Sequence, residues 1–551
     1  MTRTVSEATW AIVHNGELYN TKELREELST RGWTFHTTSD TEVILLSYLE
    51  YGPDFIKKLN GIFATAIYDP KKEQIFLYRD RSGIKPLFYT LQNEELVFAS
   101  ELKGLFTVPG IHPRLDRQGL NEIFSIGPAR TAGCGVFQDI HEVLPGHYLT
   151  YGPDGLKQTC YWKLESHPHE DDYGTTVEKT THLVWDSIRR QMVSDVPICT
   201  FLSGGVDSSL VSAVCAAELR KKGEQLNTFS FDFTGNDHNF KASSFQPSQD
   251  RPYVEKMVKY LGSNHRYLEC STCDQIGLLK NSVDAHDLPP MADVDSSLLY
   301  FCSQVTEYNK VALTGECADE IFGGYPWFHN KECFDAHTFP WTMNLNARKV
   351  LLNDDFLDYL KMDEYVAFRY EASIAKTPRL KEDSPKEARR REIAYLNQQW
   401  FMQTLLNRMD RTSMYSGLEA RVPFADHRII EYVWNIPWDM KTKDGVVKGL
   451  LRECGKDLLP GEILFRRKSP YPKTYDAGYE ALLAARVRDL LDDPESPVLP
   501  FLDRKKTEQF LTAPSDYGKP WYGQLMAAPQ MMAYIWQVDY WMRKYQITIH
   551  A

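Results

Sequence analysis

The 551-residue sequence has no apolar run long enough to span a bilayer and no signal-peptide pattern at its N-terminus. It is also poor in positive charge, with 63 Lys and Arg against 75 Asp and Glu and a net charge of -12. This balance argues against a general nucleic-acid-binding surface, although it leaves room for a local basic pocket. We therefore expect neither a membrane nor a nucleic acid as partner.

Paired cysteines are scarce as well. The ten cysteines are scattered, and the C-x-x-C formed by Cys270 and Cys273 has no second pair to complete a zinc site. Thiols in such an arrangement are reduced by default, which favours a cytoplasmic location. The chain also lacks internal repeats and low-complexity tracts, and its length favours two or more domains.

The most informative stretch is V-P-I-C-T-F-L-S-G-G-V-D-S-S-L at residues 196–210. An apolar strand pattern ends at Ser203-Gly204-Gly205, and a helical pattern begins near Asp207. A glycine turn of this kind points backbone N–H groups and the positive end of a helix at one place, where they stabilise an anion. Asp207 would repel a bare phosphate, so its position suggests that Mg²⁺ lies between the carboxylate and phosphates.

This stretch lacks the Gly-Lys-Ser/Thr of a Walker A loop, which argues against transfer of a terminal phosphoryl group. An ordinary strand–helix turn with a serine N-cap is the alternative interpretation. The complete S-G-G-x-D-S string is more specific than such a turn. It resembles the pyrophosphate loop of the ATP pyrophosphatases, which make AMP and pyrophosphate while they activate a carboxyl or similar oxygen.

The chain divides into two regions of different pattern. Residues 1–165 are strand-rich with a few short helices, and the polar residues 165–174 are the best linker candidate. Residues 175–551 begin with alternating strands and helices and then become mainly helical. Such alternation predicts a parallel sheet whose ligands lie at the carboxyl ends of its strands.

Local signals predict several element boundaries. In the first region we expect a strand at residues 11–13 that ends in the turn pair Asn15-Gly16. We also expect a helix at residues 21–31 with Thr21 as its N-cap, and a second helix capped by Ser39. In the second region, the periodicity predicts a helix at residues 177–192.

A second acidic loop, T-G-E-C-A-D-E at residues 314–320, follows an expected strand at residues 310–313. Its three carboxylates repel one another unless a cation lies among them. An acidic first turn of a helix is the alternative interpretation. Because both acidic loops follow strands of one expected sheet, we favour a site for ATP with Mg²⁺. Asp207 and Asp319 would then be metal ligands, and Glu316 would lie near the reacting carbonyl.

Three motifs together resemble the glutamine-dependent asparagine synthetases. They are S-G-G-V-D-S, T-G-E-C-A-D-E-I-F-G-G-Y and G-L-E-A-R-V-P-F-A-D, in this order. The resemblance covers nearly the whole chain. The family activates the aspartate side chain as β-aspartyl-AMP and then lets ammonia displace AMP. The resemblance implies a two-domain α/β and α+β fold. A partial Ntn-hydrolase (αββα) glutaminase sandwich would span residues 1–165, and a parallel-sheet ATP-pyrophosphatase synthetase domain would span residues 175–551.

The resemblance also implies roles for individual residues. Glu316 matches the family glutamate that handles the incoming ammonia, and Lys448 matches the lysine that neutralises phosphate charge as the adenylate forms. Arg421 resembles the family arginine near the aspartate site, with a structural ion pair to Glu419 as the alternative. The implied ATP contacts are Phe201, Leu202, Ser203, Gly204, Gly205, Asp207, Ser208, Phe233 (against the adenine), Thr314 and Gly315.

In one place the sequence departs from the family pattern. Many members carry an arginine in the loop that here reads P-P-M-A-D-V-D-S-S, where Asp293 stands. A carboxylate cannot bind another carboxylate or a pyrophosphate directly. We therefore expect a differently organised amino-acid pocket, and an acceptor other than free aspartate stays open.

The first region resembles the family's glutaminase domain through N-G-E at residues 15–17 and S-D-T-E-V at residues 39–43. By this resemblance the Asn15 side chain and the Gly16 amide form an oxyanion hole, while Glu17 and Asp40 hold the amino group of glutamine. Without the family context, a hairpin turn and a helix cap would explain these residues.

The nucleophile of such a domain is missing from the sequence. The family's cysteine follows the initiator Met, whereas this chain has Thr2, and its first cysteine is Cys134. We interpret the chain as beginning several dozen residues late, because the arginine that clamps the glutamine carboxylate and the strands that would place a threonine nucleophile are missing too. We expect free ammonia as the nitrogen source and a first domain destabilised by uncovered strand edges.

Two other functions stay open at this point. The β-lactam synthetases and lasso-peptide cyclases share the fold and close a ring within one substrate, so the need for a second, diffusible nucleophile discriminates them. A non-enzymatic regulatory protein is a third interpretation, against which the complete ATP loops argue. The substrates and cofactors that we expect are aspartate, glutamine or ammonia, ATP and Mg²⁺, and a homodimer is one candidate assembly.

Overall fold

The computed structural model describes residues 1–240, 248–512, 520–523 and 525–550. They form two compact units, which we describe one at a time. The first unit comprises Met1–His112, Ala132–Glu165 and Asp426–Glu431, and the second comprises Pro113–Thr131, Ser166–Ala425 and Tyr432–Ala551. Within the described ranges, no helix combines the length and the hydropathy that a membrane span requires.

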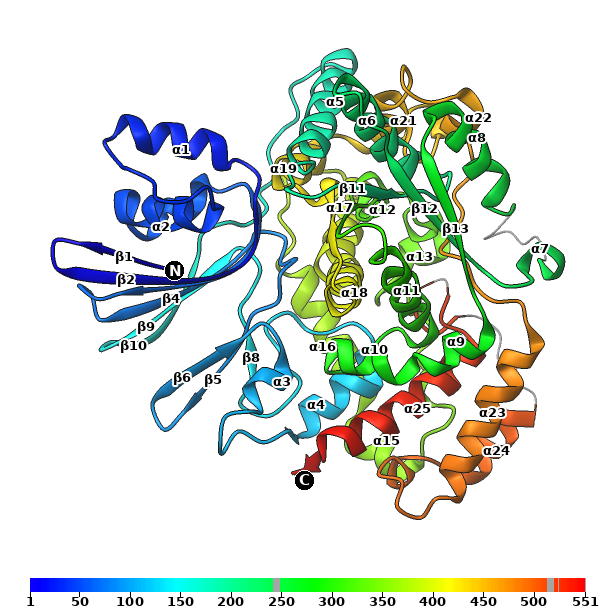
Figure 1. The fold of residues 1–551 in the computed structure, drawn as a ribbon. Helices are drawn as coiled ribbons and strands as arrows, with labels where there is room; N and C mark the ends of the chain where they lie inside the picture. Colours follow the sequence, from blue (N-terminus) through cyan, green and yellow to red (C-terminus); the bar gives the residue numbers. More distant parts are fainter. Residues whose placement is uncertain (241–247, 513–519, 524, 551) are drawn as a thin grey trace. The chain divides into compact units, whose positions relative to one another are not determined.

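The first unit is built on a six-stranded antiparallel sheet (Figure 1). Its strand order is β1 (Thr2–Val5), β2 (Ala8–Leu18), β3 (Gly61–Asp69), β4 (Gln74–Arg79), β9 (His147–Gly152) and β10 (Gly155–Cys160). A smaller sheet contains β6 (Glu95–Ala99), β5 (Phe88–Gln92) and β8 (His141–Glu142). The helices are α1 (Thr21–Thr30), α2 (Asp40–Tyr51) and α3 (Leu102–Leu105), with a 3₁₀ helix at Gly52–Lys58.

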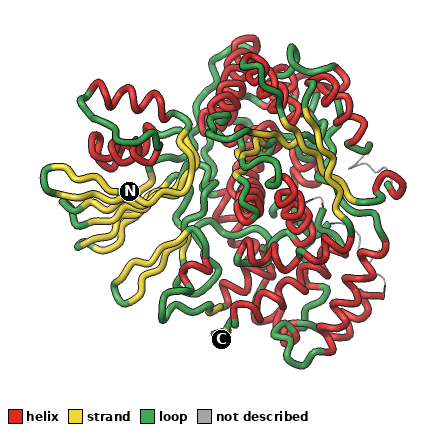
Figure 2. Tube along the Cα trace, viewed as in Figure 1, coloured by secondary structure: helices red, strands yellow, loops and turns green. Residues whose placement is uncertain are grey.

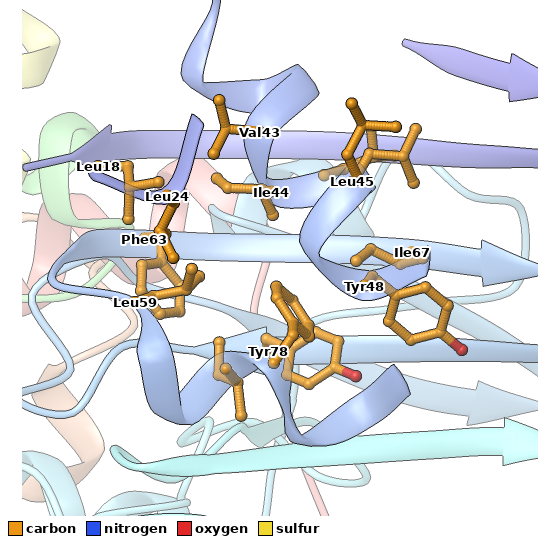
Figure 3. Packing of buried hydrophobic residues seen from close by; sticks show 14 of the residues in the cluster. Leu18, Leu24, Val43, Ile44, Leu45, Tyr48, Leu59, Phe63, Ile67 and Tyr78 are labelled. Atoms are coloured by element: carbon orange, nitrogen blue, oxygen red, sulfur yellow. The ribbon is translucent and has the colours of Figure 1, made fainter. Parts of the chain in front are cut away.

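Alternation along β3 separates two hydrophobic cores, because successive side chains of a strand point to opposite faces. Phe63 and Ile67 pack with residues of α1 and α2 in the larger core (Figure 3). Ala64 and Ala66 point the other way and pack with Tyr89 of the small sheet. The resulting layers of helices, large sheet and small sheet confirm the expected sandwich.

The predicted end of the strand at Asn15-Gly16 is wrong. β2 continues to Leu18, and Gly16 lies opposite Phe63 of β3. A Cβ at Gly16 would lie 2.0 Å from the carbonyl oxygen of Ile62. The glycine therefore serves the close approach of two paired strands, and this need produces the same residue type as a hairpin turn.

The two helix caps predicted in the first unit have different outcomes. Thr21 is the first residue of α1 rather than its N-cap, and its hydroxyl donates to the carbonyl of Leu18 (2.7 Å). The N-cap position is taken by Asn20. The cap at Ser39 is confirmed, since its Oγ accepts a hydrogen bond from the Thr41 N–H (3.1 Å).

The second unit contains a five-stranded parallel sheet in the order β13-β12-β11-β14-β15, which confirms the predicted parallel sheet. β13 and β15 are not predicted from the sequence, because their polar residues give no apolar run. The strands are β11 (Ile198–Phe201), β12 (Asn227–Phe233), β13 (Asn264–Cys270), β14 (Val311–Leu313) and β15 (Glu419–Arg421).

Helices cover both faces of this sheet. Thr200 of β11 faces α6 (Val206–Lys221), where its hydroxyl lies 2.7 Å from the Ser212 hydroxyl. The neighbouring Cys199 packs instead with Phe301 of α11 (Ala292–Val305) and Met409 of α18 (Met402–Tyr415). Since side chains alternate along a strand, α6 lies on one face and α11 with α18 on the other.

The rest of the second unit is mainly helical, as the red segments of Figure 2 show. The helix α5 (Tyr173–Arg190) begins earlier than predicted because Asp172 caps it by accepting from the Thr175 N–H (2.7 Å). Two short strands, β7 (Arg114–Leu115) and β16 (Thr548–Ile549), also pair in parallel. The remaining helices are α4 (Arg117–Asn121), α7 (Asn236–Asn239), α8 (Arg251–Leu261), α9 (Thr272–Gly277), α10 (Leu279–His286), α12 (Ala318–Phe322), α13 (Lys331–Asp335), α14 (Asn346–Lys349), α15 (Asp354–Leu360), α16 (Met362–Ile374), α17 (Pro385–Leu396), α19 (His427–Asn435), α20 (Trp438–Lys441), α21 (Gly449–Cys454), α22 (Gly461–Leu464), α23 (Ala477–Asp492), α24 (Arg504–Thr512) and α25 (Ala528–Tyr545).

Candidate active site

Two loops meet at the carboxyl ends of neighbouring strands in the second unit. β11 and β14 are paired, with Thr200 opposite Leu313, and each strand is followed by one of the predicted glycine-containing loops. A Cβ at Gly315 would lie 2.8 Å from the backbone nitrogen of Ser208. Glycine at this position therefore lets the second loop pack against the first turn of α6.

The first loop leaves the N-terminus of α6 open. Gly205 occupies the N-cap position and offers no side chain to the first turn of the helix. The Ser208 hydroxyl accepts from the Ser203 N–H (3.1 Å) and lies 3.0 Å from the Ser203 hydroxyl. Backbone N–H groups, two hydroxyls and the positive end of the helix thus converge where an anion is stabilised.

These loops line a pocket of about 270 Å³. The predicted residues that line it are Phe201, Leu202, Ser203, Asp207, Ser208, Thr314, Gly315, Glu316 and Asp319. The predicted residues Gly204, Gly205, Phe233, Lys448 and Arg421 are outside the lining.

Lys448 lies directly behind the lining and joins its two loops. Its Nζ is 2.6 Å from an Asp207 carboxylate oxygen and 2.5 Å from an Asp319 oxygen, and its side chain is 2% exposed. Lys468 forms a second ion pair with Asp319. Gly324 packs so closely on this group that a Cβ would lie 2.6 Å from the Lys448 Cε. Lys448 is therefore a buried residue of the site and not a solvated surface lysine.

The ionisation of this cluster follows from its contacts. Burial raises the pKa of Asp207, although the ammonium group of Lys448 opposes this shift. Burial acts on Asp319 in the same direction, but Lys448 and Lys468 outweigh it and hold the pKa of Asp319 well below its usual range. Burial would lower the pKa of Lys448, but the two carboxylates raise it instead. The cluster therefore keeps a buried positive charge between the loops.

The three carboxylates of the second loop are accommodated in three different ways. Asp319 contacts two lysines, whereas Glu316 pairs with Arg408 at 2.7 Å. Among the described residues no cation pairs with Glu320. Burial, Asp319 and Glu316 raise its pKa to about 8, and its oxygen accepts from the Tyr325 hydroxyl (2.6 Å). The mutual repulsion expected from the sequence is thus relieved by two kinds of cation and by protonation.

Arg421 is not placed in this pocket, which corrects its assignment to the aspartate site. Its Nε donates to Glu419 (2.6 Å), and its Nη1 donates to the carbonyls of Gln191 (2.7 Å) and Val193. The backbone of Arg421 lies at the sheet edge of the site, where its carbonyl accepts from the Thr314 N–H (3.0 Å). The structural ion pair is the interpretation that the structure supports.

The aromatic residues of β12 that line the pocket are Phe229 and Phe231, whereas Phe233 is outside the lining. Phe233 is buried and meets Phe231 edge-on, with ring centroids 5.1 Å apart. Phe231 stacks on Tyr471, with centroids 5.6 Å apart and an interplanar angle of 16°. Because Phe231 and Phe233 share one face of the strand, the sequence pattern could not tell which of them reaches the pocket.

The predicted glutamine-site residues lie near the end of β2 in the first unit. Asn15 Nδ2 donates to the Ser100 hydroxyl (3.2 Å). Asp40 accepts from the Leu18 N–H (3.1 Å), and one of its oxygens is 3.7 Å from His14 Nε2. Burial would raise the pKa of Asp40, but His14 and the backbone N–H groups outweigh it and lower that pKa. This arrangement holds a negative charge beside Asn15, Gly16 and Glu17.

Thr2 lies in the edge strand β1, opposite Ala11 of β2. The amino group of Met1 donates to the carbonyl of Ile12 (2.9 Å), so it is used in the sheet. Asn15 lies four positions beyond Ala11 along β2, a distance of about 13 Å in an extended strand. Thr2 is therefore not placed against the proposed oxyanion residues.

Comparison with known families bears on both units. A family model described as asparagine synthase matches residues 179–543, which is more than half of the chain. The chain belongs to this family. A model of a glutamine amidotransferase domain matches residues 2–162, which lie mostly in the first unit.

Curated relatives of this asparagine synthase family member cover most of its length. The glutamine-hydrolysing asparagine synthetase 3 of Bacillus subtilis is 47% identical over 98% of this chain and 88% of its own length. Asparagine synthetase 1 of the same organism is 30% identical over 84% of this chain and 76% of its own. Asparagine synthetase B of Escherichia coli is 26% identical over 84% and 70%. These relatives favour an asparagine synthetase over a ring-closing ligase.

Arg408, Lys468 and Tyr471 are among the pocket residues that the sequence patterns do not reveal. Arg408 and Lys468 contact the acidic loop, and Tyr471 forms part of the aromatic wall. Arg408 sits on α18, where its neighbours follow an ordinary amphipathic pattern, and no local signal marks it. The R-R-K-S-P-Y run around Lys468 is a basic cluster beside a proline and was the signal available for the other two residues.

Proposed function

We propose that this member of the asparagine synthase family makes asparagine from aspartate in its second unit. An oxygen of the aspartate β-carboxylate attacks the α-phosphorus of ATP, pyrophosphate leaves, and β-aspartyl-AMP forms. Ammonia then attacks the acyl carbon, AMP leaves with the former carboxylate oxygen, and a proton is released. The observation that carries the proposal is the pairing of two loops at adjacent strand ends with Lys448 between their carboxylates.

The first loop would bind the phosphates of ATP. The open N-terminus of α6 and the hydroxyls of Ser203 and Ser208 supply donors without a fixed cation. Lys448 adds one positive charge on a long side chain that can follow the negative charge as pyrophosphate leaves. The aromatic wall of Phe231 and Tyr471 offers a flat apolar surface for the adenine.

We propose Asp207 and Asp319 as the residues that hold Mg²⁺. Their carboxylates already face one common cation, the Lys448 ammonium, so the space between them accepts positive charge. Mg²⁺ at nucleotide sites is typically held by one or two carboxylates together with phosphate oxygens, which these residues and ATP would offer. When bound, the ion would neutralise charge on the phosphates.

Glu316 is our candidate for the ammonia step. Its carboxylate lines the pocket beside Gly315, and its side chain is 20% exposed. An ionised carboxylate can accept hydrogen bonds from ammonium and take a proton as the nitrogen attacks. In the substrate-free protein its carboxylate is positioned by an ion pair with Arg408 (2.7 Å).

We propose free ammonia as the nitrogen source of this polypeptide. The amine-binding pair Glu17 and Asp40 fits a glutamine site, but Thr2 lies far from Asn15 along the sheet. The cysteines of the first unit form local hydrogen bonds. The Cys134 sulfur accepts from the Val136 N–H, and the Cys160 thiol donates to the Trp162 carbonyl. We also propose a cytoplasmic location, because the scattered cysteines suit a reducing compartment, and a homodimer as the candidate assembly.

The test measures pyrophosphate release from ATP, Mg²⁺ and aspartate with either ammonium or glutamine as nitrogen source. We expect release with ammonium, together with equal amounts of asparagine and AMP, and no glutamate from glutamine. Release with neither nitrogen source would overturn the proposed activity. Glutamate formation would overturn free ammonia as the nitrogen source but leave the synthetase proposal in place.

A further inference from the structure

We propose that Arg408 binds the α-carboxylate of the acceptor amino acid, an assignment that rests on the proposed function. Because the β-carboxylate is the one to be activated, the α-carboxylate needs a cation elsewhere in the pocket. Asp293 does not supply this contact, since its carboxylate is buried and accepts from Gln275 (3.2 Å) and Gln530 (3.0 Å). The positive charge that binds the α-carboxylate must therefore come from another element.

Arg408 is a buried guanidinium whose hydrogen-bonding capacity is mostly unused. The residue lines the pocket and is 5% exposed. Within the described part of the chain its hydrogen bond goes from Nη2 to Glu316 (2.7 Å), and its Nε has no hydrogen-bond partner. A guanidinium carries five N–H donors, and buried donors are nearly always paired in native proteins. The unused donors indicate a ligand.

The surroundings of Arg408 select a carboxylate as that ligand. The planar fork of an arginine matches two carboxylate oxygens, and the apolar residues Leu405 and Met409 of the same pocket strengthen such a bond. The other cations of the lining are already used or exposed. Lys468 pairs with Asp319, and Arg251 pairs with Glu269 while 47% of its side chain is exposed.

Two acidic residues face Arg408 and determine how much of its charge is available. Glu316 contacts Nη2. The Oδ1 of Asp295 lies 4.0 Å from Nε and has no hydrogen-bond partner in the part of the chain that the structure describes. Burial raises the pKa of Asp295 to about 7, so Asp295 carries less negative charge to pair with Arg408 than a fully ionised carboxylate would. An arriving carboxylate therefore competes mainly with Glu316. Binding of the acceptor would release Glu316 for the ammonia step.

The experiment compares L-aspartate with its α-amide, which keeps the β-carboxylate to be activated but lacks the α-carboxylate. Ammonium-dependent pyrophosphate release is measured for both substrates with the full-length wild-type protein and with R408Q. In R408Q we expect kcat/KM for aspartate to fall roughly 10- to 150-fold, the range for losing a hydrogen bond to a charged group. The value for the α-amide should change much less, and KM for ATP should stay the same.

Two further variants separate binding from folding. R408K keeps the charge without the fork, and we expect it to restore part of the preference for aspartate over the α-amide. R411K alters a buried arginine of the same helix that pairs with Asp287 (2.8 Å) and does not line the pocket. It should lower stability without changing the preference.

An unchanged preference in an active R408Q protein would overturn the assignment of Arg408 alone. A loss of the preference in R411K as large as that in R408Q would also overturn it, because the effect would then be structural. If the wild-type protein releases no pyrophosphate with aspartate, the proposed function is wrong, and the assignment of Arg408 is overturned together with it.

Discussion

The two units hold partly buried carboxylates in different ways. In the first unit, Asp40 is fixed by the Leu18 N–H and lies near His14. In the second unit, Asp207 and Asp319 share the ammonium group of Lys448. A backbone N–H cannot move when a ligand arrives, whereas a lysine on a four-carbon stem can. The first arrangement suits a fixed recognition site, and the second suits a site whose charges must be redistributed during a reaction.

A glycine marks each site, and the comparison extends to these two residues. Gly16 lets two strands approach, because a Cβ would lie 2.0 Å from the Ile62 carbonyl oxygen. Gly315 lets two loops approach, because a Cβ would lie 2.8 Å from the Ser208 nitrogen. The same residue type therefore serves the integrity of a sheet in one unit and the assembly of a pocket in the other. Substitutions can separate these roles.

The largest effect is expected from K448M. Removing the shared ammonium leaves two buried carboxylates without their common partner and removes a charge proposed to stabilise the leaving pyrophosphate. We expect aspartate-dependent pyrophosphate release to fall roughly 100- to 1000-fold, as when a preorganised charge-stabilising donor is removed. K456M is the matched control, since the Lys456 side chain is 66% exposed and pairs with Glu453. A K448M protein with more than a tenth of wild-type activity would contradict the proposed role.

The next effect is expected from G315A. The added methyl group would push the second loop away from α6, and a displacement of about 1 Å at an active site can reduce the rate roughly 100-fold. Steady-state kinetics of pyrophosphate release should show a lower kcat together with a higher KM for ATP. G461A is the control, because a Cβ there meets nothing within 4 Å. Equal kinetics for the two variants would show that the loops do not need this contact.

A smaller and more local effect is expected from G16A. The clash with Ile62 should lower the free energy of unfolding of the first unit by about 1–3 kcal/mol, the usual cost of overpacking. Ammonium-dependent synthesis in the second unit should be retained. Limited proteolysis and thermal unfolding measure the first effect, and pyrophosphate release measures the second.

The control for G16A is G155A, where φ is +78° but a Cβ meets nothing within 4 Å. That variant carries only the backbone cost of a left-handed residue, about 1–2 kcal/mol. If G16A is no less stable than G155A, close approach of β2 and β3 is not the reason for the glycine.

The smallest effect is expected from D40N. The folded pKa of Asp40 is lowered, so its charge adds stability that is present above the unfolded value near 3.9 and is lost as the pH falls through the folded pKa. D40N should therefore flatten the acid side of the stability profile of the first unit. D154N serves as the control, since the Asp154 side chain is 70% exposed. Chemical unfolding at a series of acidic pH values measures the difference.

Patterns that are local in the sequence predicted the structure well. The parallel sheet and the Ser39 cap follow from strand periodicity and from side chains that act within a few residues. The two loops were expected together because the carboxyl ends of parallel strands meet at one edge of a sheet, and the pairing of β11 with β14 confirms this. The same reasoning predicted Asp207, Glu316 and Asp319 in one pocket.

Features that depend on distant residues could not be predicted in this way. Arg408 comes from α18, and its role depends on Glu316 and Asp295, which are far away in the sequence. Arg421 follows a family motif, but its side chain turns to the carbonyls of Gln191 and Val193. Gly16 was misread because a hairpin and a close strand pair impose the same demand on a residue. Motifs thus identify backbone positions, and the packing of remote elements decides where each side chain goes.

The lysine between Asp207 and Asp319 has a consequence for the protein before any substrate arrives. A cation that belongs to the chain cannot be washed out or chelated, so the empty pocket does not depend on dissolved metal for its shape. Purification and storage in a chelating buffer should therefore leave the melting temperature of the second unit unchanged. The loops would be ready in advance, and a divalent ion would be needed only during turnover.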